Sequence, residues 1–129
     1  MKKQGILNRE LAGIFAKLGH TDQITIADCG LPIPEGVPCI DLSYKVGKPS
    51  FLEVLEVILE DLEVEKAFIA TEIEDKNVAL LKEIGDIFST IEKVSHEELK
   101  KLTANSKVII RTGEATPYAN VILQSGVIF

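Results

Sequence analysis

Short apolar runs alternate along this chain with amphipathic segments that carry helix-capping signals, and this alternation restricts the fold more than any other feature. The runs predict strands at residues 24–28, 39–43, 66–70, 91–94, 107–111 and 120–124. Nearly continuous apolar strands separated by helices are typical of a largely parallel sheet that is covered on both faces. The sequence therefore predicts an α/β fold, layered α/β/α with a largely parallel sheet, as a single domain over residues 1–129.

Helices are expected in the longer segments between these strands. Asn8 is a favourable N-cap for the first helix, and Gly19 is a suitable residue to end it. The clearest helix begins after Ser50, which pairs with Glu53 as a capping box, and its apolar residues recur at helical spacing. The expected helices span residues 8–18, 50–62, 78–88 and 96–105.

Charge and motifs exclude several classes of function. The chain has 14 Lys and Arg residues against 20 Asp and Glu, a formal net charge of -6, which disfavours binding to nucleic acid or to an anionic membrane surface. No apolar run approaches the ~20 residues of a membrane span, and no signal peptide is recognisable, so a cytoplasmic location is expected. Cys29 and Cys39 lack the spacing of a zinc site and should stay reduced there. No metal or nucleotide motif is present, so we expect no metal and no cofactor.

Two titratable side chains lie at the first predicted strand, in the stretch LGHTDQITIADCGLPIP at residues 18–34: one precedes the strand and the other ends it. His20 could donate and accept a proton, as histidine side chains do near neutral pH, but it also fits an exposed position after a helix. Asp28 could orient an imidazole or hold a sugar hydroxyl, but it also fits an ordinary turn at the end of a strand. One hypothesis is a polar site shared by His20 and Asp28, and the other is two unrelated surface residues.

Further polar residues occur later in the chain. His96 opens a short predicted helix, where it could donate to a ligand hydroxyl or simply face solvent. The stretch RTGEATPYAN, residues 111–120, follows another strand. Its Tyr118 and Asn120 suit the recognition of hydroxyl groups, although its composition also fits a plain turn. Because ligands of such sheets bind beyond the carboxyl ends of the strands, this stretch and Asp28 could meet in space.

Three longer stretches together are specific for one family. GILNRELAGIFAKLGHTDQITIADCGLPIP, GKPSFLEVL and IIRTGEATPYANVIL resemble the D-ribose pyranases, which are related to the fucose mutarotases. The resemblance runs along the whole chain and is least distinctive between about residues 60 and 90. It implies a sugar mutarotase, an isomerase that interconverts the pyranose and furanose forms of D-ribose without a metal or cofactor, in the utilisation of ribose.

The resemblance also implies roles for individual residues. His20 corresponds to the family's catalytic histidine, and Asp28 corresponds to a substrate-binding aspartate. His96 falls on a binding histidine, with a looser match around it, and the ligand-binding tripeptide falls on Tyr118, Ala119 and Asn120. The family forms ring-shaped homo-oligomers, pentamers or stacked decamers, so the resemblance implies such a ring with sites at the contacts between neighbouring chains.

The implied reaction agrees with these side chains. Exchange between ring forms opens a hemiacetal, which moves a proton from the anomeric hydroxyl to the ring oxygen, and then closes it on another hydroxyl. His20 suits this transfer because an imidazole can shuttle a proton in both directions, and Asp28 would orient its ring or a sugar hydroxyl. Two alternatives remain open at this point: a non-catalytic sugar-binding accessory of transport or regulation, and a fucose mutarotase.

Overall fold

The six expected strands form one sheet in the computed structural model, which describes residues 1–129. Their order across the sheet is β2-β5-β1-β6-β3-β4, and only β6 runs against the others, so the predicted largely parallel sheet is confirmed. The strands are β1 (Gln23–Ala27), β2 (Cys39–Asp41), β3 (Val64–Ala70), β4 (Ile91–Val94), β5 (Ile109–Arg111) and β6 (Val121–Ser125).

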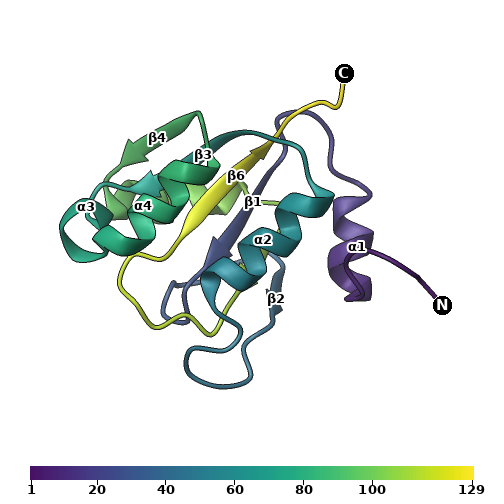
Figure 1. Ribbon diagram of the computed structural model, residues 1–129, viewed down its shortest axis with the longest axis horizontal. Coiled ribbons are helices and arrows are strands. Elements are labelled where there is room, and N and C mark those ends of the chain that lie inside the picture. Colours follow the sequence, from purple (N-terminus) through teal and green to yellow (C-terminus); the bar gives the residue numbers. More distant parts are fainter.

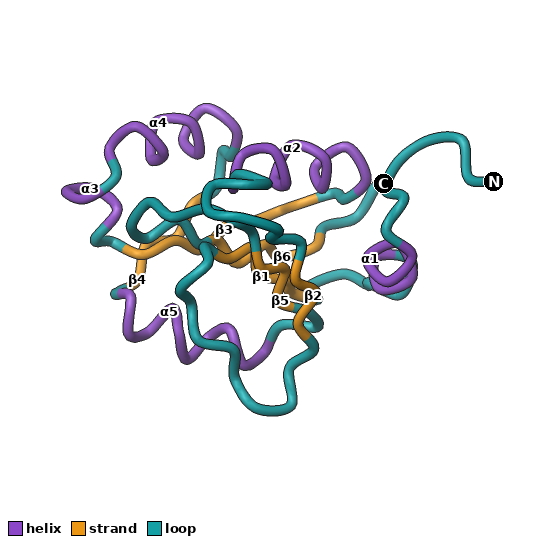
Figure 2. The backbone as a smooth tube through the Cα atoms, turned by 90° about the horizontal axis from the view of Figure 1, so that it is seen from below, coloured by secondary structure: helices purple, strands orange, loops and turns teal.

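Helices cover both faces of this sheet, which confirms the predicted α/β/α layers. Figure 2 shows α2, α3 and α4 on one face and α5 on the other, with α1 beside the edge that carries β2. No helix of the structure is long and apolar enough to span a membrane. The helices are α1 (Arg9–Phe15), α2 (Phe51–Asp61), α3 (Ile73–Lys76), α4 (Val78–Ile87) and α5 (His96–Leu102), which continues into a 3-10 turn at Thr103–Asn105.

Helix boundaries differ from the sequence expectation in two places. The first helix ends at Phe15, because the backbone N–H groups of Lys17 and Leu18 bond to carbonyls three residues back and tighten the chain into turns. Gly19 therefore lies beyond the helix and does not end it. The four-residue α3 was not expected, since one helical turn is too short to show an apolar period.

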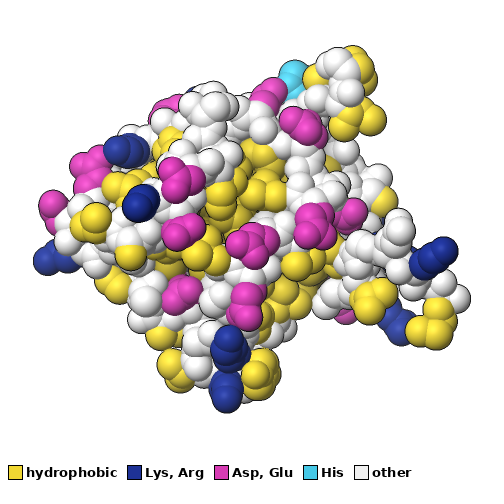
Figure 3. Space-filling view, in the orientation of Figure 1, with side chains coloured by type: hydrophobic (Ala, Val, Ile, Leu, Met, Phe, Trp, Pro, Cys, Tyr) yellow, Lys and Arg dark blue, Asp and Glu magenta, His cyan; other side chains and the backbone are white.

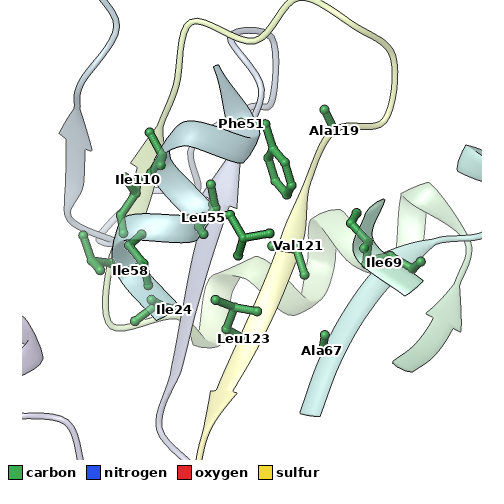
Figure 4. Close-up of a cluster of buried hydrophobic side chains, with 14 of the residues drawn as sticks. Ile24, Phe51, Leu55, Ile58, Ala67, Ile69, Ile110, Ala119, Val121 and Leu123 are labelled. Atoms are coloured by element: carbon green, nitrogen blue, oxygen red, sulfur yellow. The ribbon is translucent and has the colours of Figure 1, made fainter. Parts of the chain in front are cut away.

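The core is built around α2, as its capping box and apolar stripe predict. Ser50 Oγ accepts from the N–H of Glu53, and the Glu53 carboxylate accepts from the N–H of Ser50. Figure 4 shows side chains of α2 facing those of β1 and β6 across this layer. Each such side chain stabilises the fold by about 1.5–3 kcal/mol when it leaves water. The buried side chains in this view include Phe51, Leu55, Ile58, Ile24, Val121 and Leu123.

Strand direction decides which loops lie together. The segments that follow β1, β3, β4 and β5 lie at the carboxyl edge of the parallel strands, and the segment that precedes β6 lies there too. The C-terminus lies toward the opposite edge (Figure 1). The segment between β5 and β6 is held tightly at the carboxyl edge. A Cβ on Gly113 would lie 2.4 Å from the carbonyl oxygen of Lys48, so only glycine fits there.

Candidate active site

Asp28 and Asn120 meet at the carboxyl edge of the sheet, which confirms the expectation that their two stretches come together. The N–H of Asp28 donates to Oδ1 of Asn120 at 2.8 Å, and Nδ2 of Asn120 donates to Oδ2 of Asp28 at 2.9 Å. Oδ1 of Asp28 accepts from the N–H of Gly30 at 2.9 Å. Asn120 is fully buried, while Asp28 remains partly exposed. The buried amide therefore fixes the direction of a carboxylate that a ligand can still reach.

His96 and Tyr118 lie beside this carboxylate as a packed aromatic pair. Their ring centroids are 5.1 Å apart and their planes are nearly perpendicular, at 81°. Nδ1 of His96 is buried and has no hydrogen-bond partner in the protein. Tyr118 adopts φ +57°, a left-handed conformation that is uncommon for a bulky residue. An unpaired polar atom and local backbone strain often coincide at binding sites.

These groups surround one small cavity of about 260 Å³. Ala119 does not line it, because its side chain points into the core (Figure 4), and Asn120 acts on it through Asp28. The mixture of one carboxylate, one imidazole and one phenol with apolar walls suits a small ligand rich in hydroxyl groups. The cavity is lined by Asp28, Gly30, Leu31, His96, Pro117 and Tyr118.

Two residues that hold the cavity walls in place were not predicted from the sequence. Both oxygens of Glu72 accept from the backbone N–H of His96, at 2.9 and 3.1 Å, and so fix the start of α5. Nδ2 of Asn77 donates to Thr116 Oγ1 and to the carbonyl oxygen of Pro117, which holds the loop before β6. Both supports come from the segment around α3, for which the sequence carried no signal, since their partners lie more than twenty residues away.

A larger hollow of about 500 Å³ lies elsewhere, between residues 5–8 and α2. Apolar side chains such as Leu7 and Val57 dominate its walls, and its one carboxylate, Glu53, is engaged in the capping box of α2. It offers no group positioned for proton transfer. The smaller cavity beside Asp28 is therefore the candidate for chemistry, despite its size.

His20 lies at the other end of β1 from Asp28. The two residues flank a five-residue strand, which at about 3.3 Å per residue is roughly 16 Å long. Within one chain the structure therefore does not bring His20 to the cavity that holds Asp28, His96 and Tyr118. The hypothesis of one ligand held between His20 and Asp28 needs these residues to come from two copies of the chain.

The His20 side chain is exposed to solvent and contacts a carboxylate. Its Nε2 lies 2.9 Å from Oε2 of Glu65 on β3, and the two side chains are 53% and 35% exposed. Hydrogen bonds from Gln124 and from His20 lower the pKa of Glu65 below its usual range, so its carboxylate stays ionised at neutral pH. Glu65 is thus a neighbour of His20 that the sequence analysis did not identify.

The electrostatic surroundings favour a neutral ligand over an anion. Figure 3 shows acidic side chains spread over the face that carries α2, with basic side chains mostly toward the margins. The net charge of -6 gives the same sign for the whole chain. No three His, Cys, Asp or Glu side chains come together as metal ligands would. The groups at hand are suited to hydrogen bonding and proton transfer.

Comparison with known proteins places this arrangement in a family. The model of the RbsD / FucU transport protein family matches residues 1–128. The chain belongs to this family. A D-ribose pyranase from an Exiguobacterium species is 59% identical over 129 residues, which cover all of both chains. The family assignment agrees with the resemblance that the three sequence stretches carry.

Solved structures of the RbsD / FucU family share this fold. The structure of Bacillus subtilis RbsD complexed with D-ribose has a TM-score of 0.97 to this chain, at 55% identity and with full coverage of both chains. The fucose mutarotase from Streptococcus pneumoniae in complex with L-fucose has a TM-score of 0.77 at 21% identity, with 95% of each chain covered. The similarity to the fucose mutarotase establishes the fold alone. The similarity to Bacillus subtilis RbsD includes sequence identity at more than half of the residues.

Proposed function

We propose that this protein is an isomerase that interconverts the pyranose and furanose forms of D-ribose. The observation that carries the proposal is the cavity at which Asp28, His96 and Tyr118 converge, in a chain that is 59% identical to a D-ribose pyranase along its whole length. The cavity presents one carboxylate acceptor, one unpaired imidazole nitrogen and one phenol, which together suit the several neighbouring hydroxyls of a pentose. A cytoplasmic location, where Cys29 and Cys39 stay reduced, is part of this proposal.

The reaction needs only binding and proton transfer. Asp28 accepts hydrogen bonds from sugar hydroxyls, and His96 and Tyr118 contact the sugar from the other side of the cavity. The hydrogen bond from Asn120 fixes the orientation of the Asp28 carboxylate. His20 removes the proton of the anomeric hydroxyl, the bond between C1 and the ring oxygen breaks, and the ring oxygen takes up a proton. Closure on a different hydroxyl reverses these steps. A positioned general acid or base of this kind typically contributes about 10²–10⁴-fold.

Catalytic amounts of the protein should accelerate exchange between the ribopyranose and ribofuranose signals and leave their ratio unchanged. An enzyme lowers a barrier for both directions, whereas a sugar-binding accessory shifts populations only in proportion to its own concentration. Exchange NMR at micromolar protein and millimolar ribose measures both quantities. Unaltered exchange rates would favour the accessory role that the transport description of the family suggests, and faster exchange of fucose than of ribose would favour a fucose mutarotase.

The proposal includes a ring-shaped homo-oligomer, a pentamer or a stacked decamer. His20 reaches the cavity of a neighbouring copy in such a ring, which reconciles its role with its position at the far end of β1. Exposed apolar residues support an extended contact: the side chains of Ile128 and Phe129 are almost fully exposed, and Leu7 is 75% exposed beside the large apolar hollow. A contact between two different surfaces of one chain closes into a ring when its rotation allows.

Light scattering should therefore give the mass of a ring rather than of one chain. Replacement of both Ile128 and Phe129 by aspartate should lower that mass and the exchange rate together, because charges at a buried apolar contact must be desolvated. The concentration series should extend to the level used for exchange NMR. A monomeric mass for the unmodified protein at that concentration would rule out a site shared between chains.

A further inference from the structure

A row of hydrogen-bonded side chains ends at His20. Nε2 of Gln23 on β1 donates to Oε1 of Gln124 on β6 at 3.2 Å, and Nε2 of Gln124 donates to Oε1 of Glu65 on β3 at 2.6 Å. The remaining oxygen of Glu65, Oε2, lies 2.9 Å from Nε2 of His20. Three neighbouring strands thus contribute to one row. The hydrogen bonds from Gln23 to Gln124 and from Gln124 to Glu65 hold the Glu65 carboxylate in place beside the His20 imidazole.

The backbone around His20 is held in an unfavourable conformation. Thr21 has φ +71°, and a β-branched residue in this left-handed region is a genuine outlier. The conformation persists because the N–H of Thr21 donates to the carbonyl oxygen of Ser125 at 2.9 Å and the N–H of Gly19 donates to Oδ2 of Asp22 at 2.8 Å. Strain that the surroundings maintain is typical of functional positions. The backbone on both sides of His20 is therefore held, and the His20 side chain bonds to Glu65.

A carboxylate accepts hydrogen bonds but cannot donate one. Nε2 of His20 must therefore carry a proton when it bonds to Glu65, which leaves Nδ1 as the nitrogen that is free to exchange a proton. We propose that Glu65 is a positioning residue that fixes this tautomer of His20 and makes Nδ1 the atom that reacts with the sugar. This inference rests on the proposed function, since it adds a partner and a reactive atom to the same histidine.

One nitrogen is sufficient for the whole proton transfer. The anomeric hydroxyl oxygen and the ring oxygen are both bonded to C1, so they lie close to each other. Nδ1 takes the hydroxyl proton, the C1–oxygen double bond forms, and the electron pair of the broken C1–ring oxygen bond stays on the ring oxygen. The same proton then passes from Nδ1 to that oxygen. His20 is an imidazolium only between the two transfers, and the Glu65 carboxylate stabilises that charge.

The charged groups around His20 determine how pH affects this step. Glu65 and Lys66 belong to β3, Glu63 precedes that strand, and Asp22 lies on the loop of His20 itself, where Lys107 is 3.6 Å from its carboxylate. Loss of the Glu65 charge makes the protonated imidazole less favourable. Protonation that blocks the reaction then requires a lower pH, so the acidic limb of the activity profile moves toward lower pH.

Glu65→Gln should lower kcat roughly ten- to a hundredfold with KM nearly unchanged, by analogy with the loss found when the carboxylate that orients a metal-bound histidine is removed. Its acidic limb should move to lower pH. The matched control is Glu63→Gln, which removes the same charge from an exposed carboxylate that makes no hydrogen bond, and should behave like the unmodified protein. A Glu65→Gln variant with unchanged kcat and an unshifted profile would overturn the proposal, and so would a rise in KM alone.

The tautomer itself provides a test that does not depend on activity. The chain has only two histidines, so ¹⁵N spectra of histidine-labelled protein at alkaline pH contain two imidazoles, and the His20→Ala variant assigns them. The neutral His20 ring should carry its proton on Nε2. In Glu65→Gln the introduced amide donates toward Nε2, so the proton should move to Nδ1. A proton on Nδ1 in the unmodified protein would refute the inference even if the protein is an active isomerase. If His20 has the predicted tautomer but the protein does not accelerate ribose exchange, the proposed function is refuted. The conclusion that Glu65 fixes the tautomer of His20 then still stands.

Discussion

His20→Ala should lower the exchange rate at saturating ribose by roughly 10²–10⁴-fold, the contribution of a general acid or base, and should leave ribose affinity nearly unchanged. The reason is chemical: among the residues that the resemblance assigns, only His20 and His96 are imidazoles, which can both accept and donate a proton, and His96 is packed against Tyr118 in the cavity. Because the His20 side chain is 53% exposed, its removal should also leave the fold stable. Exchange NMR measures the rate, and calorimetry measures the affinity.

His96→Asn is the comparison that separates transfer from binding. His96 contributes to the cavity, so this variant should weaken ribose binding and change the saturated rate less. The unmodified protein should lose activity as the pH falls, because a protonated His20 cannot accept the first proton. Normal saturated exchange in His20→Ala would move the proton transfer elsewhere, and His96 would be the next candidate.

Mixing variants tests whether the site is shared between chains. Below saturating ribose both parent proteins should show little exchange, because His20→Ala lacks the group that transfers the proton and Asp28→Ala binds ribose weakly. When equal amounts of the two variants exchange subunits, about half of the chains in a ring have an intact His20 and about half have an intact Asp28. About a quarter of the contacts should then combine an intact His20 with an intact Asp28 of the next chain. Activity should return to about that fraction. No recovery after confirmed subunit exchange would place both residues in one chain and contradict the ring model of the site.

The fold was predictable because local signals agree with one another. The capping box at Ser50 and Glu53, the apolar stripe of α2 and the short apolar strands all indicate the same layered architecture, and the structure has it. The meeting of Asp28 with Asn120 was also predictable, because loops at the carboxyl ends of strands share one edge of the sheet. These inferences need only the direction of each strand.

The relation between His20 and Asp28 was not predictable from their closeness in sequence. An extended strand separates its two flanking residues by its full length, so two residues eight positions apart lie at opposite edges. The contact with Glu65 was equally hidden, since it depends on the pairing of β6 with both β1 and β3. The pairing of strands that are distant in the sequence, and the assembly of several copies of the chain, leave no short pattern in a single sequence.

Asp28→Asn and Asp28→Ala should both weaken ribose binding, by about ten- to a hundredfold, which corresponds to the ~1.5–3 kcal/mol of a hydrogen bond to a charged group. Their effects on stability should differ. Asn120 is fully buried and donates from Nδ2 to the Asp28 carboxylate, and an asparagine at position 28 still offers an oxygen to accept that hydrogen bond. In Asp28→Ala the buried amide loses its acceptor, which should lower the free energy of unfolding by about 1–3 kcal/mol.

Denaturant unfolding of the three proteins, together with calorimetric ribose titrations, separates these contributions. Asp28→Asn should unfold at nearly the same denaturant concentration as the unmodified protein and bind ribose weakly. Its one remaining oxygen can still accept from the buried Asn120, and the N–H of the exposed Gly30 can bond to water instead. Asp28→Ala should show both defects, because the side chain that aims at the ligand is also the partner of Asn120. Ribose affinity that survives in Asp28→Asn would mean that the carboxylate serves the buried amide alone. The sugar would then be held by His96, Tyr118 and the histidine of the next chain.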